Sequence, residues 1–158
     1  MAEIGQPAPA FSLESDSGET ISLDSLRGRA AVIYFYPKDD TPGCTRQALA
    51  IRDNWGEFGR LGATVIGVSP QSAESHRRFK EKYSLPFPLL ADTEHEMAEA
   101  YGVWVEKTNY GKTSMGINRS GFVIDGEGRL VAAKRGIKPD DHSAWALAEV
   151  EKLVAAPA

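Results

Sequence analysis

Residues 30–46, which read AAVIYFYPKDDTPGCTR, decide the fold of this chain. The opening run, up to Pro37, is rich in β-branched and aromatic side chains, which is typical of a buried strand that leaves the core. Two prolines, a glycine and two aspartates then predict a tight, rigid loop. Apolar side chains recur at helical spacing directly afterwards and indicate a helix that runs to about position 61.

Cys44, the only cysteine among the 158 residues, falls in the first turn of this expected helix. A helix N-terminus carries roughly half a positive charge and several free N–H groups, and together these stabilise a thiolate. The alternative is an inert structural residue, because free cysteine is among the most buried residue types. The Pro-Gly lead-in and the position at a helix start favour a reactive thiol.

The same residues resemble a known family. The spacing Pro37-x-x-x-Thr41-x-x-Cys44 matches the P-x-x-x-[TS]-x-x-C signature of the peroxiredoxins. The longer string YFYPKDDTPGCTRQA is similar to their bacterioferritin comigratory protein (PrxQ) branch, and the similarity runs over most of the chain. The resemblance implies a thiol-dependent peroxidase that reduces hydrogen peroxide and organic hydroperoxides through a Cys44 sulfenic acid, with no metal or organic cofactor.

Composition and charge exclude several other classes of protein. With 42% hydrophobic and 25% charged residues, the chain is expected to form one domain over residues 1–158. A net charge of -4 argues against a nucleic-acid partner. The sequence has neither an apolar run of membrane-helix length nor a signal-peptide pattern, so we expect a cytoplasmic protein with no membrane partner. A lone cysteine also fits a reducing compartment.

Periodicity and turn residues predict the remaining elements. In chain order these are a hairpin over 11–13 and 20–23, a helical turn over 24–28, a strand over 63–68, a helix over 73–83, a strand over 87–91, a helix over 94–101, a hairpin over 118–125 and 129–135, and a final helix after Asp140-Asp141. Residues 103–116 are expected to be a long functional or mobile loop. This order indicates α/β layering. The family resemblance implies a thioredoxin-like fold, with a central mixed sheet flanked by helices and an added N-terminal β-hairpin.

Thiolate attack on a peroxide needs an ionised sulfur and donors for two adjacent oxygens. We expect the Thr41 hydroxyl beside the sulfur, donating to it or to a peroxide oxygen. The backbone N–H groups of Gly43 and Cys44 are candidate donors to the substrate, in the manner of an oxyanion hole. Pro37 is expected to make the loop rigid and to exclude water, with help from Pro42.

The resemblance also implies a cation beside the cysteine. Peroxiredoxins carry a distant arginine in a [GS]-x-x-R-x-x-F-x-I-D-like context, which residues 116–125, GINRSGFVID, match. Arg119 is therefore expected to point from the start of a strand at the Cys44 sulfur, where its permanent charge suits both thiolate and peroxide. The simpler interpretation of any single arginine is a solvated surface charge. Arg46, nearer in sequence, is expected to point outward.

One departure from the family pattern affects the mechanism. Many PrxQ relatives place a second cysteine five residues after the first, where this chain has Leu49. We therefore expect a one-cysteine mechanism in which an external thiol, such as thioredoxin, glutaredoxin or a small thiol, reduces the sulfenic acid. A disulfide between two copies of Cys44 is sterically harder. Easy over-oxidation to sulfinic acid at high peroxide is also expected.

Other hypotheses about function and assembly remain open at this point. A peroxide sensor or redox-signalling protein would use the same activated cysteine, whereas an inactive scaffold is disfavoured by the intact site pattern. A monomer is expected, with a weak dimer as the alternative. No metal site is expected, because the three histidines are widely spaced and acids are favoured at helix starts anyway. In the loop before Arg119, packing is the favoured role for Trp104, Tyr110 and Met115, with a rim over the peroxide pocket as the alternative.

Overall fold

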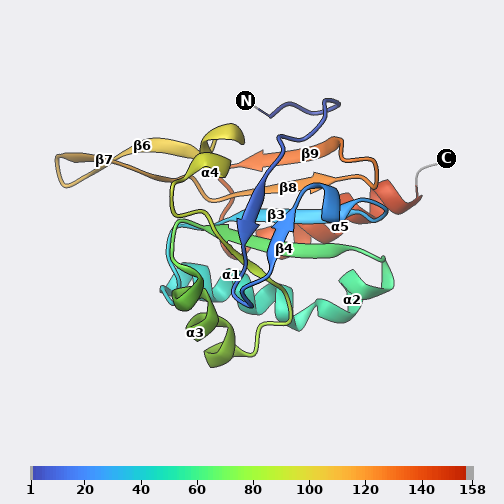
Figure 1. The fold of residues 1–158 in the computed structure, drawn as a ribbon, viewed down its shortest axis with the longest axis horizontal. Helices are drawn as coiled ribbons and strands as arrows, with labels where there is room; N and C mark the ends of the chain where they lie inside the picture. The colour runs from blue at the N-terminus through green and yellow to red at the C-terminus, as the bar shows by residue number, and fades with distance from the viewer. Residues whose placement is uncertain (1, 156–158) are drawn as a thin grey trace.

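A five-stranded mixed sheet forms the centre of the computed structural model, which describes residues 2–155 (Figure 1). The strand order is β5-β4-β3-β8-β9. β3 (Ala31–Phe35) pairs in parallel with β4 (Thr64–Ser69), which pairs in parallel with β5 (Leu89–Ala91). On its other side β3 pairs antiparallel with β8 (Ser120–Ile124), and β8 pairs antiparallel with β9 (Leu130–Arg135). The expected mixed α/β sheet is confirmed.

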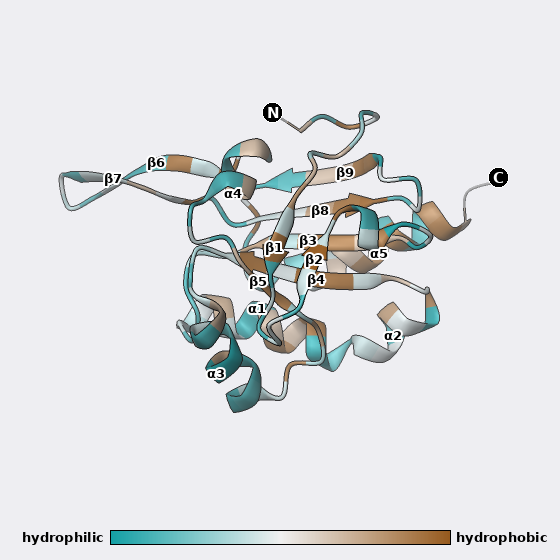
Figure 2. Ribbon diagram, viewed as in Figure 1, coloured by the Kyte–Doolittle hydropathy of each residue, from teal (hydrophilic) through white to brown (hydrophobic). Residues whose placement is uncertain are grey.

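The centre of the sheet is buried on both faces, since every residue of β3 is buried. Successive side chains of β3 point to opposite faces. Ile33 and Phe35 join one apolar cluster, whereas Val32 and Tyr34 join a second cluster that also contains Cys44. Figure 2 shows the apolar character concentrated in these central strands. The single cysteine is therefore part of the core on one defined side of the sheet.

Four helices pack on the side that holds Cys44: α1 (Pro42–Asp53), α2 (Trp55–Arg60), α3 (Ala73–Tyr83) and α5 (His142–Ala155). α3 has its expected bounds, and the side chain of Ser72 caps it by accepting the Ser75 N–H. The prediction of a single helix that reaches position 61 is wrong, because the observed helix breaks at Asn54. The backbone of Asn54 leaves the helical region, and its side-chain amide donates to the Ala50 carbonyl and to the Ser143 hydroxyl.

Shorter elements cover the opposite face. They are the hairpin of β1 (Ser12–Glu14) and β2 (Thr20–Ser22), the turn η1 (Asp24–Leu26) and α4 (Glu96–Ala100). The expected N-terminal hairpin is thus confirmed. The Asp92 carboxylate accepts the N–H groups of Met97 and Ala98 in the first turn of α4, whose N-cap residue is His95.

The loop expected over residues 103–116 is instead a β-hairpin of β6 (Trp104–Asn109) and β7 (Lys112–Ile117), which projects from the body in Figure 1. Tyr110 and Gly111 both have left-handed backbones, with φ of 53° and 79°, as a tight hairpin turn requires. Polar side chains on both faces hid the strand alternation in the sequence. The expected packing of Tyr110 and Met115 is also wrong, because they are 106% and 51% exposed. Trp104 does pack, stacking on His95 with ring centroids 4.1 Å apart.

Candidate active site

The C-terminal end of β3 and the N-terminal end of β8 lie at the same edge of the sheet, because these strands are antiparallel. Phe35 pairs with Ser120, so the residue before β8, Arg119, falls beside the end of β3. The chain leaves β3 through the loop of residues 36–41, and α1 then begins at Pro42. The strand register therefore brings two distant parts of the sequence together where α1 starts.

Cys44 lies in the first turn of α1, as expected, and is 1% exposed. Thr41, the N-cap residue immediately before α1, has extended backbone angles, and its side chain makes no capping hydrogen bond. The first N–H groups of a helix have no partner within the helix, so those of Gly43 and Cys44 remain available as donors. The helix start therefore offers a positive dipole end and free donors at the sulfur.

Arg119 donates from Nη2 to the Cys44 Sγ at 3.4 Å, across 75 residues of sequence. Its Nη1 donates to the side-chain oxygen of Gln47, and its backbone carbonyl accepts the Ile137 N–H at 2.9 Å. Both ends of the residue are therefore held. The guanidinium therefore places a permanent positive charge and a hydrogen-bond donor beside the sulfur. The structure brings Arg119 and Cys44 together, as the family resemblance implied.

The approach of the guanidinium depends on Gly43. A Cβ at this position would lie 3.3 Å from Arg119 Nη2 and 3.2 Å from Pro139 Cγ. These contacts are tighter than ordinary van der Waals distances, so a larger residue here would displace one of its neighbours. Gly43 therefore makes room for Arg119, a role that sequence reasoning did not assign to it.

Gln47 is a further residue of this cluster that sequence reasoning missed. It lies one helical turn after Cys44 and is fully buried. Its oxygen accepts from Arg119, and within residues 2–155 its Nε2 has no hydrogen-bond partner. The available signal was an amide side chain on the otherwise apolar inner face of α1, beside Ala48 and Ile51.

The Thr41 hydroxyl has a different partner from the one expected. It donates to the Lys38 carbonyl at 2.9 Å and so closes the loop, whereas we expected it to donate to the sulfur or to a peroxide. A hydroxyl that donates still has two lone pairs with which it can accept. Pro37 is half-buried at the start of this loop, and Pro42 occupies the first helical turn. Arg46 points outward, as expected, and pairs with Asp140 at 3.0 Å.

Three titratable side chains surround Arg119 and Cys44. His142 is fully buried, and burial followed by the charge of Arg119 lowers its pKa to about 3, so it is neutral at pH 7. Burial and Arg119 also lower the pKa of Lys107. Burial, followed by the negative charges of Cys44 and Asp39, raises the pKa of Tyr34 well above its usual value. Arg119 is therefore the permanent charge beside the sulfur, while His142 and Tyr34 stay neutral.

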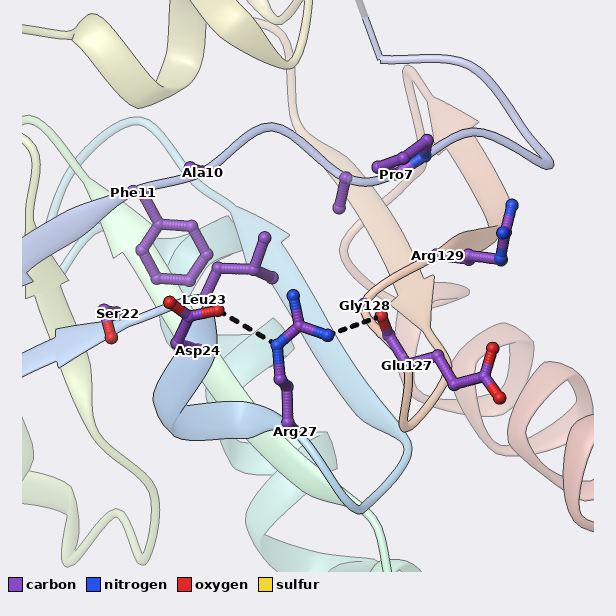
Figure 3. Close-up of a pocket in the computed structure, with 11 residues that line it drawn as sticks. Pro7, Ala10, Phe11, Ser22, Leu23, Asp24, Arg27, Glu127, Gly128 and Arg129 are labelled. Carbon is purple, nitrogen blue, oxygen red and sulfur yellow. Dashed lines mark hydrogen bonds and ion pairs between the residues drawn. The ribbon is translucent and has the colours of Figure 1, made fainter.

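A cavity of about 620 Å³ lies between the N-terminal segment, η1 and the β8–β9 turn (Figure 3). Its Arg27 is already bonded to the Asp24 carboxylate and to the Glu127 carbonyl, and no lining residue belongs to the Cys44 cluster. Residues 2–155 contain no group of His, Cys, Asp and Glu side chains suited to a metal ion. Among the same residues, no helix is long and apolar enough to cross a bilayer.

Comparisons with known proteins agree with this geometry. The model of the AhpC/TSA family matches residues 4–133. The chain is 52% identical over 151 residues to the peroxiredoxin Bcp of Bacillus subtilis, covering 96% of each sequence. The bacterioferritin comigratory protein of Xanthomonas campestris, described for its alkyl peroxide reduction activity, superposes with a TM-score of 0.90 at 36% identity, covering 98% of this chain and 99% of that one. A yeast mitochondrial 1-Cys peroxiredoxin, described for thiol resolution via glutathione/thioredoxin systems, gives a TM-score of 0.81 at 25% identity, covering 97% and 76%.

Proposed function

The chain belongs to the AhpC/TSA family and, within it, to the Bcp/PrxQ peroxiredoxins, and from this membership we propose that it is a thiol-dependent peroxidase whose nucleophile is Cys44. The observation that carries the assignment of the nucleophile is the contact of 3.4 Å between Arg119 Nη2 and the Cys44 sulfur at the start of α1. A buried sulfur that faces a fixed guanidinium and free N–H donors is the arrangement that peroxide cleavage needs.

In the first step the Cys44 thiolate attacks the terminal oxygen of the hydroperoxide. A sulfur–oxygen bond forms, the oxygen–oxygen bond breaks, and its electron pair leaves on the departing oxygen. Cys44 becomes a sulfenic acid. The departing alkoxide or hydroxide takes a proton from solvent, and this balances the proton that the thiol lost on ionising. Arg119 and the N–H groups of Gly43 and Cys44 stabilise the negative charge as it moves from sulfur to oxygen.

Thr41, Pro37 and Pro42 shape the site. Because the Thr41 hydroxyl donates to the Lys38 carbonyl, we assign it an accepting role, in which its free lone pairs receive the O–H of the peroxide. Pro37 fixes the backbone where the loop leaves β3. Pro42 has no N–H, so it starts the helix without competing for the substrate, and the donors at Gly43 and Cys44 follow it directly.

Reduction of the sulfenic acid follows a one-cysteine route. The chain has no second cysteine, so a thiol from another molecule attacks Cys44, releases water and forms a mixed disulfide. A second external thiol then displaces Cys44 and regenerates it. Thioredoxin, glutaredoxin and small thiols are the candidate reductants, and a compartment that supplies reduced thiols, such as the cytoplasm, suits this route. One copy of the chain suffices for the first step, because Cys44, Gln47 and Arg119 all belong to it.

Peroxide consumption by the purified protein tests this function. With a thioredoxin or glutaredoxin recycling system, we expect many equivalents of peroxide to be consumed per chain. The Cys44→Ser variant should consume none above background. A single stoichiometric oxidation with every recycling thiol tried would instead support the peroxide-sensor alternative, and no oxidation of Cys44 would reject both.

A further inference from the structure

Asp39 lies in the loop that leads from β3 to Cys44, and its buried carboxylate makes hydrogen bonds to α3. Its Oδ2 faces His76 Nδ1 at 2.8 Å and accepts the Ser75 hydroxyl at 2.7 Å. Its Oδ1 accepts the Tyr36 hydroxyl at 2.6 Å. Two of these partners belong to α3, which begins more than thirty residues after the loop. One carboxylate oxygen therefore attaches the loop to α3, while the other accepts a hydrogen bond from within the loop.

His76 completes this connection and is fully buried. Its Nε2 faces the Leu90 carbonyl in β5 at 2.8 Å, while its Nδ1 faces Asp39. Both ring nitrogens of His76 therefore have a partner, and the ring joins the loop to β5. Burial alone would raise the pKa of Asp39, but the hydrogen bonds from His76, Tyr36 and Ser75 lower it overall, which supports an ionised carboxylate. The two side chains thus form a buried pair in which both carboxylate oxygens and both ring nitrogens have partners.

The neighbouring residue, Asp40, is held by the other end of α3. Its carboxylate accepts from Lys82 Nζ and from the Tyr83 hydroxyl, each at 2.7 Å. Its backbone is in the left-handed region, with φ of 56°, a conformation that aspartate tolerates but that costs free energy. The contacts with α3 thus hold the loop in a conformation that its own backbone does not favour.

These contacts bear directly on the active site, because α1 begins two residues after Asp40. The backbone of Arg119 is held separately, by its position beside β8 and its bond to Ile137, while its guanidinium donates to Gln47 on α1. The distance between the Arg119 guanidinium and the Cys44 sulfur therefore depends on how the loop of residues 36–41 sits against α3. A displacement of about 1 Å in a reacting group can cost on the order of 100-fold in rate.

We propose that Asp39 and His76 are positioning residues for peroxide reduction, which hold the loop of residues 36–41 against α3 so that Cys44 meets Arg119 in the reactive geometry. This inference rests on the proposed peroxidase function. Neither residue is needed to touch the peroxide or the sulfur. Their effect passes through the backbone of the loop and the first turn of α1.

Three variants test the proposal. Asp39→Ala removes the carboxylate, whereas Asp39→Asn keeps a side chain that can accept from Tyr36 and donate to His76 in its neutral form. Leu130→Ala is the matched control: Leu130 is fully buried in the cluster on the opposite face of the sheet, and its truncation lowers stability without touching the loop. The readouts are the single-turnover rate with hydrogen peroxide, the rate of alkylation by iodoacetamide, and unfolding in urea.

We expect Asp39→Ala to lose on the order of 100-fold in the peroxide rate, with a much smaller loss in alkylation, because alkylation needs the thiolate but not the aligned donors. Asp39→Asn and Leu130→Ala should stay within a few-fold of wild type. A folded Asp39→Ala chain that reacts at the wild-type rate would overturn the proposal. So would an equal loss in Leu130→Ala, which would show general destabilisation, or an equal loss in Asp39→Asn, where the hydrogen bonds persist.

If Asp39→Ala does not fold, Tyr36→Phe tests the positioning role in its place. It deletes one donor to the carboxylate and leaves the ring in place, so we expect a rate loss of about tenfold, the order of one hydrogen bond. An unchanged rate in Tyr36→Phe would overturn the positioning role. Wild-type protein that does not react with peroxide at all would reject the proposed function itself, so the two failures are distinguishable.

Discussion

The guanidinium of Arg119 donates both to the Cys44 sulfur and to the side-chain oxygen of Gln47. Gln47 lies one helical turn after Cys44 on α1. Arg119 therefore bridges two side chains of one helix. The bridge fixes the orientation of the charge as well as its distance from the sulfur. It also explains why a polar amide occupies a fully buried position on the inner face of α1.

Replacing Gln47 by methionine should weaken catalysis while the fold is kept. Methionine fills a similar volume but cannot accept from Arg119, so the guanidinium loses one of its two anchors. We expect the peroxide rate to fall about tenfold, the order of one charge-assisted hydrogen bond. Stopped-flow kinetics of the reduced protein measure this. The control is Arg46→Met, a substitution on the same helix α1 that removes only the exposed ion pair of Arg46 with Asp140. It should leave the peroxide rate unchanged.

Removal of the charge at position 119 should have a larger effect. In Arg119→Met the thiolate loses its neighbouring cation and the departing oxygen loses a donor, so we expect a loss of roughly 100-fold or more. Arg119→Lys keeps a charge but not the fork that reaches both Cys44 and Gln47, so an intermediate rate is expected. Stopped-flow kinetics of the three reduced proteins with hydrogen peroxide measure this order. An Arg119→Met chain with wild-type peroxide kinetics would contradict the assigned role.

Gly43→Ala separates activity from stability. Alanine is the better helix former by roughly 1 kcal/mol, so the helix itself should not be weakened. Its Cβ, however, would lie 3.2 Å from Pro139 Cγ and 3.3 Å from Arg119 Nη2, and we expect the flexible guanidinium to move away from its position beside the sulfur. We expect a peroxide rate reduced about tenfold with unfolding in urea unchanged or shifted to higher concentration. Full activity in this variant would show that the close approach of Arg119 is dispensable.

A second cysteine should change how the sulfenic acid is resolved. In the wild-type chain excess peroxide is expected to convert Cys44 to sulfinic acid, because the chain has no other thiol to compete. In Leu49→Cys the new thiol lies five residues along α1, with Cα atoms about 9 Å apart in a regular helix, too far for a disulfide. We therefore expect an internal disulfide only with local unwinding of α1. Mass spectrometry after peroxide titration should show protection from sulfinic acid, accompanied by reduced helical circular dichroism.

Acid should destabilise the chain through Asp39. Burial raises the pKa of the Asp39 carboxyl in the folded state, but its hydrogen bonds and the nearby His76 outweigh burial and lower this pKa overall. A carboxyl with a lowered folded pKa contributes stability that is present above its unfolded pKa of about 4, and that stability is lost as the pH falls through the folded value. The free energy of unfolding, measured in urea at successive pH values, should therefore fall more steeply below about pH 4 in wild type than in Asp39→Asn. Parallel curves would contradict this contribution.

Local patterns determined much of the fold. The apolar run of β3, the proline and glycine that follow it, and the spacing of α3 each depend on neighbouring residues, so strand, loop and helix could be placed before any coordinates. The same patterns placed Cys44 at a helix start. They failed for β6 and β7, where polar side chains lie on both faces of an exposed hairpin, and at Asn54, where a contact with Ser143 accompanies the break of the helix.

By itself, then, the sequence determined that one cysteine opens a helix at the end of a buried strand, and that a matching motif carries an arginine far along the chain. Only the tertiary structure decided how these groups meet: Arg119 between Cys44 and Gln47, Thr41 on the Lys38 carbonyl, and Asp39 on His76. The physical reason is that such contacts depend on the pairing register of β3 with β8 and on the packing of α3 against the loop, and both join residues that are distant in sequence.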